Sequence, residues 1–219
     1  MYDNQRLKFK HNNPYTIGIE EEYMICDPET GDLIDKANDI ISFLPDKMKP
    51  RFSYELLLSE IEINTPICNS LDDAMNEIIN LRNYVKNIGS KLGYRIGISG
   101  THPDALAKNQ TFVNTDGYRW VSDQLGYYAK RNITYSIHIH ISVPNSKLCI
   151  SAVNSLRRWI PTLLALSNNS PFFEGELTRM KSSRTFQFGT FPRTNIPDTF
   201  NSFEDYIQIV NNYIETKTI

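Results

Sequence analysis

The sequence predicts an α+β fold in which helices cover one face of a sheet, while the other face is polar and open. Segments with apolar side chains at every second position alternate along the chain with segments whose apolar side chains recur at helical spacing. The length of 219 residues, with 40% hydrophobic and 22% charged residues, fits one globular unit with a buried core. We therefore expect a single domain that covers residues 1–219.

The first expected strand spans residues 16–25. Side chains alternate between the two faces of a strand, so Glu20 and Glu22 share one face. The opposite face is apolar, except for Glu21. Residues 27–31 (DPETG) have the composition of a turn.

Two further strands are expected nearer the middle of the chain. Residues 60–64 alternate, with Glu60 and Glu62 opposite two isoleucines. Residues 94–99 are expected to return beside them and to end at the Gly-Thr-His-Pro sequence that contains His102.

The fourth expected strand, residues 133–143, carries His138 and His140 on one face. Its opposite face is expected to be apolar throughout: Ile133, Tyr135, Ile137, Ile139, Ile141 and Val143.

The expected helices span residues 36–43, 71–92, 116–130, 148–166 and 202–214. The second begins after Ser70, an N-cap residue with Asp73 three positions later, and ends at Gly93. Pro161 is expected to bend the fourth. Residues 167–200 are expected to be rich in loops.

Charge and composition argue against several classes of protein. A net charge of −2 does not indicate a partner with an anionic surface, so we expect neither nucleic acid nor membrane. Three dispersed cysteines favour reduced thiols and a cytoplasmic location. The first 13 residues show no apolar signal core, and no apolar run approaches the roughly 20 residues of a membrane span. Walker, dinucleotide-binding and nucleophile-elbow motifs are absent.

Ionisable side chains recur on the polar faces of three expected strands. If these strands are neighbours, Glu20, Glu22, Glu62, His138 and His140 meet on one face, together with Glu60. Crowded carboxylates repel one another unless a cation neutralises them or water solvates them. Carboxylate oxygens suit Mg²⁺, and a histidine also admits Mn²⁺. The alternatives are a solvated strand face and structural histidines.

Basic residues late in the chain could clamp a phosphate or a carboxylate. Arg179, Lys181, Arg184 and Arg193 lie within ELTRMKSSRTFQFGTFPRT. The alternative is a solvated surface loop. His102 is either part of the rim of a site or a simple loop residue.

Seven segments occur in a characteristic order along the chain: GIEEEY (18–23), DPETGDL (27–33), ELLLSEIEINTPIC (55–68), GTHP (100–103), IHIHISVPN (137–145), LRRWIPTLLALSNNSPFFEG (156–175) and SSRTFQFGTFP (182–192). In this order they resemble the glutamate–cysteine ligase type 2 family, the carboxylate–amine ligases. Together these segments cover most of the chain.

The resemblance implies a largely antiparallel sheet like that of glutamine synthetase and the guanidino kinases. It also implies a reaction in which ATP phosphorylates a glutamate-like carboxylate, and a cysteine-like amine then displaces phosphate to form an amide. Mg²⁺ is the expected cofactor, with Mn²⁺ as a substitute.

Carried over by position, the resemblance gives the metal ligands as Glu20, Glu22, Glu55, Glu62 and His138. It places His138, His140 and Arg184 at the cofactor, and Arg184 is also the expected catalytic contact. Glu55 and Glu62 differ by an odd number of positions, so a bulge or a turn must separate them if both face the site.

Three readings of the function follow. Members of the family continue beyond position 219, with segments that help to close the site. The chain is therefore either a ligase or a truncated, non-catalytic remnant that binds Mg-ATP or serves as a dimerisation partner. A homodimer is expected. A metal-dependent hydrolase built on His138 and His140 is the third reading, but it needs later histidine or aspartate ligands.

Overall fold

The computed structural model describes residues 9, 13–192 and 194–218, and their contacts divide them into two compact units. One unit comprises Ile17–His140 and Asn168–Thr194, and the other comprises Met1–Thr16, Ile141–Ser167 and Asn195–Ile219. The expected single domain over residues 1–219 remains a prediction.

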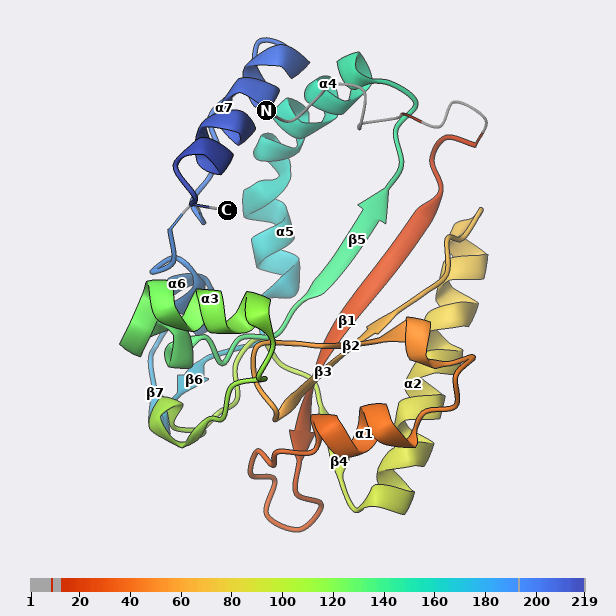
Figure 1. Cartoon of the computed structure of the whole chain (residues 1–219), viewed down its shortest axis with the longest axis vertical. Coiled ribbons are helices and arrows are strands. Elements are labelled where there is room, and N and C mark those ends of the chain that lie inside the picture. Colours follow the sequence, from red (N-terminus) through yellow and green to blue (C-terminus); the bar gives the residue numbers. More distant parts are fainter. Residues whose placement is uncertain (1–8, 10–12, 193, 219) are drawn as a thin grey trace. The chain divides into compact units, whose positions relative to one another are not determined.

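A five-stranded sheet is the centre of the larger unit within the described residues (Figure 1). Its strands are β1 (Ile17–Cys26), β2 (Phe52–Tyr54), β3 (Glu60–Asn64), β4 (Arg95–Gly97) and β5 (Ile137–Ile141). The order is β2-β3-β1-β4, and β5 also pairs with β1. The β1–β3, β1–β4 and β2–β3 pairs are antiparallel, which confirms the expected α+β class with a largely antiparallel sheet.

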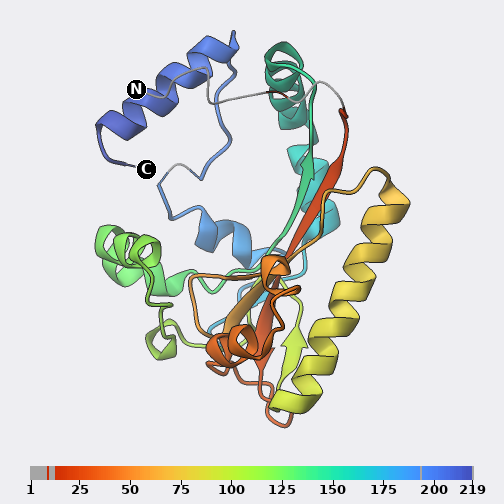
Figure 2. The ribbon, with the colours of Figure 1, turned by 45° about the vertical axis from the view of Figure 1, so that its right-hand side comes forward.

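The long helix α2 (Leu71–Leu92) covers one face of this sheet (Figure 2). The Ser70 side chain accepts a hydrogen bond from the Asp73 N–H, and Gly93 ends the helix in the left-handed conformation, as expected. Its buried side chains pack against Ile19, Tyr23 and Ile25 of β1. The short helix α1 (Ala37–Phe43) contributes to the same core.

The opposite face of the sheet is divided along its length. At one end Met24 and Cys26 pack with Ile133 and Tyr135 in a second apolar cluster, against which Tyr118 of α3 (Asp116–Leu125) is packed. At the other end this face carries Glu20, Glu22, Glu62, His138 and His140, whereas Glu60 lies opposite Met24 in the register and is buried. The glutamates and histidines that are not buried are therefore restricted to one end of the sheet.

The expected strand over residues 133–143 is wrong in extent, because regular pairing begins only at Ile137. The expected six-residue apolar face is wrong as well. Ile133 and Tyr135 are buried in the second cluster, whereas Ile137 and Ile139 are exposed. The segment before Ile137 is irregular, so the alternation of faces is not continuous along it.

Short elements complete the larger unit. They are the helix α6 (Ser183–Phe188), the strands β6 (Phe172–Phe173) and β7 (Glu176–Leu177), and the 3₁₀ turns Lys49–Arg51, Ala107–Asn109 and Gly126–Arg131. Helix α6 and the β6–β7 pair lie in the stretch expected to be rich in loops.

The smaller unit contains α4 (Ser146–Leu156), a 3₁₀ turn at Arg157–Trp159, α5 (Ile160–Ser167) and α7 (Phe203–Glu215). The expected helix over residues 148–166 is therefore interrupted just before Pro161, as the ring of a proline favours. Asn154 of α4 exchanges two hydrogen bonds with the backbone of Phe200, which precedes α7. No described helix is both long and apolar enough to cross a membrane.

Candidate functional site

Antiparallel pairing brings the carboxylates of β1 and β3 together on one face. Glu22 lies directly opposite Glu62 in the register, and Glu20 lies opposite Asn64. Because directly opposed side chains in an antiparallel pair lie close together, Glu22 and Glu62 must share a small space. A backbone hydrogen bond of 3.1 Å from the Glu22 N–H to the Ser136 carbonyl holds the start of β5 beside β1.

Glu20, Glu62 and His138 form the first ligand cluster. Each offers one ligand atom, and these atoms all lie within 4.8 Å of one another. The Nδ1 atom of His138 is 3.2 Å from a carboxylate oxygen of Glu20 and 3.8 Å from one of Glu22. This donor set of two carboxylates and one imidazole fits a small divalent cation such as Mg²⁺ or Mn²⁺.

Glu22, Glu55 and Glu62 form the second ligand cluster, again with ligand atoms within 4.8 Å of one another. Glu55 lies in the connection between β2 and β3, just after Tyr54. A turn follows Glu55 before β3 begins, and this turn supplies the change of direction that its odd spacing from Glu62 requires. The two ligand clusters share Glu62.

The pKa values of three carboxyl groups at this face, those of Glu22, Glu55 and Glu60, are raised, with desolvation as the largest cause for each. Burial raises the pKa of Glu22, against the hydrogen bond from Ser136 and the charge of His138, which lower it. Burial, with the charges of Glu22 and Glu62, raises the pKa of Glu55 to about 8. Burial and the same neighbours raise the pKa of Glu60 well above its usual range. A cation bound at this face would reverse these shifts.

His140 and Glu60 lie beside the ligand clusters without belonging to them. The Nε2 atom of His140 is 3.0 Å from the Glu20 carboxylate, and its side chain is more exposed than that of His138. Glu60 is almost completely buried. The structure thus brings together all the acidic residues and both histidines singled out in the sequence.

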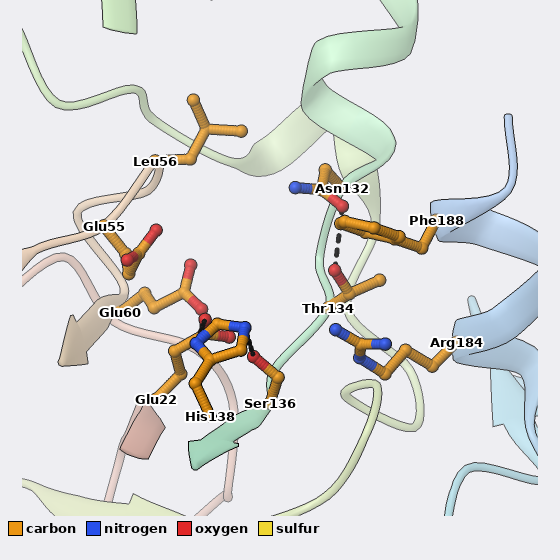
Figure 3. Close-up of a pocket in the computed structure, with 10 residues that line it drawn as sticks. All are labelled: Glu22, Glu55, Leu56, Glu60, Asn132, Thr134, Ser136, His138, Arg184 and Phe188. Atoms are coloured by element: carbon orange, nitrogen blue, oxygen red, sulfur yellow. Dashed lines mark hydrogen bonds and ion pairs between the residues drawn. The ribbon is translucent and has the colours of Figure 1, made fainter. Parts of the chain in front are cut away.

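A small pocket of about 130 Å³ opens beside the second ligand cluster (Figure 3). Its lining residues are Glu22, Glu55, Leu56, Glu60, Asn132, Thr134, Ser136, His138, Arg184 and Phe188. Figure 3 shows the carboxyl groups on one side of this pocket, and Arg184, Asn132 and Phe188 on the other. The pocket therefore has an acidic wall and a wall of hydrogen-bond donors.

Helix α6 positions Arg184 in the second wall. The Arg184 Nε–H donates a 2.9 Å hydrogen bond to the Tyr135 carbonyl, and the guanidinium lies 5.0 Å from the ring centre of Phe188, four residues later. Burial lowers the pKa of Arg184, against the charges of Glu22 and Glu60, which raise it. The guanidinium nevertheless stays charged, since arginine does not deprotonate in proteins.

The remaining basic candidates are not brought to the pocket. Arg179 and Lys181 are exposed and do not line it, and Arg193 lies outside the described residues. His102 is buried, with its Nε2 atom 3.0 Å from the Gly31 carbonyl and its Nδ1 atom accepting a hydrogen bond from the Ala105 N–H. His102 therefore joins the Gly-Thr-His-Pro loop to the turn after β1.

Sequence reasoning missed Asn132, Thr134, Ser136 and Phe188 as lining residues of the pocket. For three of them a signal was present. Thr134 and Ser136 precede His138 by four and two positions, on the polar face of the expected strand, and Phe188 follows Arg184 by four. Asn132 lies before that strand in an irregular segment, where no periodic pattern predicts the direction of a side chain.

Comparison with known proteins identifies the family of the chain. The model of glutamate–cysteine ligase family 2 matches residues 16–219. A protein from Herpetosiphon aurantiacus with the provisional name glutamate–cysteine ligase 2 is 38% identical over 210 residues, which cover 94% of this chain and 54% of that protein. A similarly named protein from Rubrobacter xylanophilus is 37% identical over 202 residues, covering 91% of this chain and 54% of the relative. The chain thus spans about half the length of these relatives.

The crystal structure of a bifunctional glutathione synthetase from Pasteurella multocida has a similar fold. Its TM-score is 0.73 at 16% sequence identity, and the match covers 93% of this chain and 31% of that one. At this identity the similarity supports the α+β fold alone. The family match extends over nearly all of the chain, from the strand with the three consecutive glutamates to the last helix, and the chain therefore belongs to glutamate–cysteine ligase family 2.

Proposed function

We propose that this chain takes part in ATP-dependent carboxylate–amine ligation, in which a glutamate-like carboxylate and a cysteine-like amine are joined through an acyl phosphate. The observation that carries the proposal is the pair of ligand clusters that share Glu62, next to a pocket with a cationic wall. Membership of the ligase family supports the reaction class.

The two ligand clusters could hold cations that neutralise the negative charge of the reactants. A carboxylate is a poor electrophile, and its conversion to an acyl phosphate brings the anionic phosphates of ATP next to a second anion. Mg²⁺ bound at these clusters would supply charge neutralisation and Lewis acidity. The residues proposed to hold it are Glu20, Glu62 and His138 on one side, and Glu22, Glu55 and Glu62 on the other.

The side chains around the ligand clusters would orient the reactants. His138 and His140 are proposed contacts for the anionic groups of ATP, because they lie at the exposed edge of the glutamates. Arg184 is a proposed contact for a substrate anion within the pocket, where partial burial strengthens its attraction. A proton held by Glu55, whose pKa is raised to about 8, must leave before this group can coordinate a metal ion.

The test is nucleotide-dependent turnover by the purified chain. We expect ADP release that requires Mg²⁺, L-glutamate and L-cysteine together, and that disappears in Glu62→Gln. Calorimetry with Mg-ADP measures binding separately. Binding without ADP release would support the non-catalytic alternative, and the absence of both would overturn the proposal.

A further inference from the structure

We propose that a second copy of this chain pairs with the free edge of β5, so that the two sheets join across a two-fold axis. Each copy then places a histidine beside the ligand clusters of the other. The inference goes beyond the proposed function, because neither a metal ion nor a nucleotide takes part in the contact. It is carried by the unpaired edge of β5, by its exposed isoleucines and by the symmetry of its sequence.

The first observation is the unpaired edge. β5 lies alongside β1 (Figure 1), which is the one strand that pairs with it within the described residues. The Glu22 N–H donates to the Ser136 carbonyl at one end of this pair. At the other end the Ser142 N–H donates to the Thr16 carbonyl. The even-numbered residues of β5 therefore direct their backbone groups to β1, and the odd-numbered residues direct theirs to the free edge.

The second observation is that this edge lacks the usual protection against pairing. Sheets protect their edges with lysine, proline, a bulge or a very short strand. β4 agrees with this rule, since it has three residues and begins at the exposed Arg95. β5 has five residues without lysine or proline, and Ile137, Ile139 and Ile141 are each more than half exposed. It is therefore suited to pair with a further strand.

The third observation is the symmetry of the strand, which identifies the partner. The sequence of β5, IHIHI, is the same in both directions. In an antiparallel pair of two such strands centred on Ile139, Ile137 lies opposite Ile141 of the second copy. Each isoleucine then meets an isoleucine, and the backbone groups at the two free edges meet in hydrogen-bonded pairs. A self-complementary contact is what a two-fold dimer requires, so a second copy fits this edge.

The same register extends the site across the axis. It places His140 of the second copy directly opposite His138, where the Cβ atoms of paired residues lie about 4.5–5.5 Å apart. The Nδ1 atom of His138 is 3.2 Å from the Glu20 carboxylate in the first ligand cluster. An imidazole of the second copy would therefore lie beside each first ligand cluster, and the polar faces of the two sheets would be continuous.

The first experiment is sedimentation equilibrium of the whole chain without ligands. We expect the wild type to have twice the mass of one chain. Ile139→Lys places two lysines opposite each other at the axis and should weaken the dimer at least about 100-fold. Ile67→Lys, at another exposed isoleucine in the connection between β3 and α2, is the matched control and should stay dimeric. Circular dichroism checks that each variant is folded.

The second experiment tests the register by disulfide formation in a Cys149→Ser background, where the remaining cysteines are buried. Ile139→Cys should form an intermolecular disulfide by itself. The Cα atoms of a hydrogen-bonded pair lie about 5.5 Å apart, which is within the range for disulfides. Ile137→Cys should form none alone, but should form one when it is mixed with Ile141→Cys.

A dimer that Ile139→Lys dissociates, with this pattern of disulfides, supports the inference. A wild type that stays monomeric up to its limit of solubility overturns it and leaves the edge to a strand of another protein. A dimer that persists in Ile139→Lys, or that forms no disulfide through Ile139→Cys, overturns it as well. Both experiments omit substrate, nucleotide and metal, so the failure of the proposed ligation would not change their results.

Discussion

Three consecutive glutamates in β1 meet two different environments on the two faces of one strand. Glu21 points into the core beneath α2, where Arg82 and the Tyr23 hydroxyl both bind its carboxylate. Glu20 and Glu22 point to the opposite face, where their neighbours are other carboxylates and two histidines. The charge of Glu21 is thus balanced by a cation of the chain itself, whereas the charges of Glu20 and Glu22 are balanced only in part.

The comparison shows how to separate a structural carboxylate from a binding one. The charge of Glu21 is balanced within the chain, so this residue needs nothing from solution. On the other face burial raises the pKa of Glu22, and burial together with the charges of Glu22 and Glu62 raises the pKa of Glu55, which is a cost to the fold unless a cation binds. Perturbed groups of this kind indicate function, whereas a fully paired group indicates stability.

The largest expected effect comes from breaking the pair on the core face. Arg82→Ala would leave the Glu21 carboxylate buried without its cation and should lower the free energy of unfolding by about 3 kcal/mol. Urea denaturation measures this change. Under conditions in which nearly all of the variant is folded, its affinity for Mn²⁺ should equal that of the wild type. A large loss of Mn²⁺ affinity would contradict the separation of the two faces.

The next effect comes from removing the carboxylate common to both ligand clusters. Glu62→Gln should weaken Mn²⁺ binding by about 100-fold or more, because it removes one ligand from each cluster. Electron paramagnetic resonance of free Mn²⁺ measures the affinity. Glu29→Gln, at an exposed glutamate of the turn after β1, is the control. Equal affinity in the wild type and Glu62→Gln would exclude this face as the metal site.

The third effect is a dependence of stability on pH that belongs to Glu55. Its folded pKa of about 8 lies above the unfolded value, so the folded chain holds the proton more tightly. Stability in the absence of metal should therefore be greatest below the unfolded pKa and should decrease as pH rises toward about 8.

Glu55→Gln carries no titrating group at this position and should remove the part of that decrease that belongs to Glu55, whereas Glu60, whose pKa is also raised, contributes with the same sign and should keep its part. Because the cation must displace the proton from Glu55, the affinity of the chain for Mg²⁺ should rise with pH over the same range. Urea denaturation at several pH values, with and without Mg²⁺, checks both. A stability that increases between pH 5 and 8 without metal would refute the assignment.

The smallest expected effect concerns His140, which pairs with Glu20 at the exposed edge. His140→Ala should change the free energy of unfolding by less than about 1 kcal/mol, as is usual for an exposed ion pair. Mn²⁺ binding should stay within about threefold of the wild type, while Mg-ATP binding weakens a few-fold. A loss of Mn²⁺ affinity as large as that of Glu62→Gln would instead make His140 a metal ligand.

Periodicity predicted the parts of the molecule that are locally determined. The bounds of α2 follow from Ser70 and Gly93. The faces of β1 and β3 follow from the alternation of side chains, so the sequence could predict that Glu20, Glu22 and Glu62 lie on one face once the two strands pair. The pairing partners themselves depend on contacts distant in sequence, and no single pattern gives them. The resemblance to a known family indicated Glu55, which alternation alone would have placed on the other face.

The wall of hydrogen-bond donors, formed by Arg184 and Asn132, was the least predictable part of the pocket. Its residues come from an irregular segment before β5 and from the short helix α6, within a stretch that reads as loop. Tertiary contacts fix the direction of Asn132 and Arg184: a hydrogen bond from Thr134 and another to the Tyr135 carbonyl. Such contacts have no period in the sequence.

The alternation of β1 has a consequence for how this gene can change in length. A deletion of one residue inside β1 would exchange the two faces, so that the carboxylate partnered by Arg82 would turn toward the ligand clusters and the others toward the core. The turn at 27–31, outside the paired segment, can absorb a change of length without that exchange. Natural variation in length should therefore accumulate after Cys26, while the ten residues of the strand keep their number.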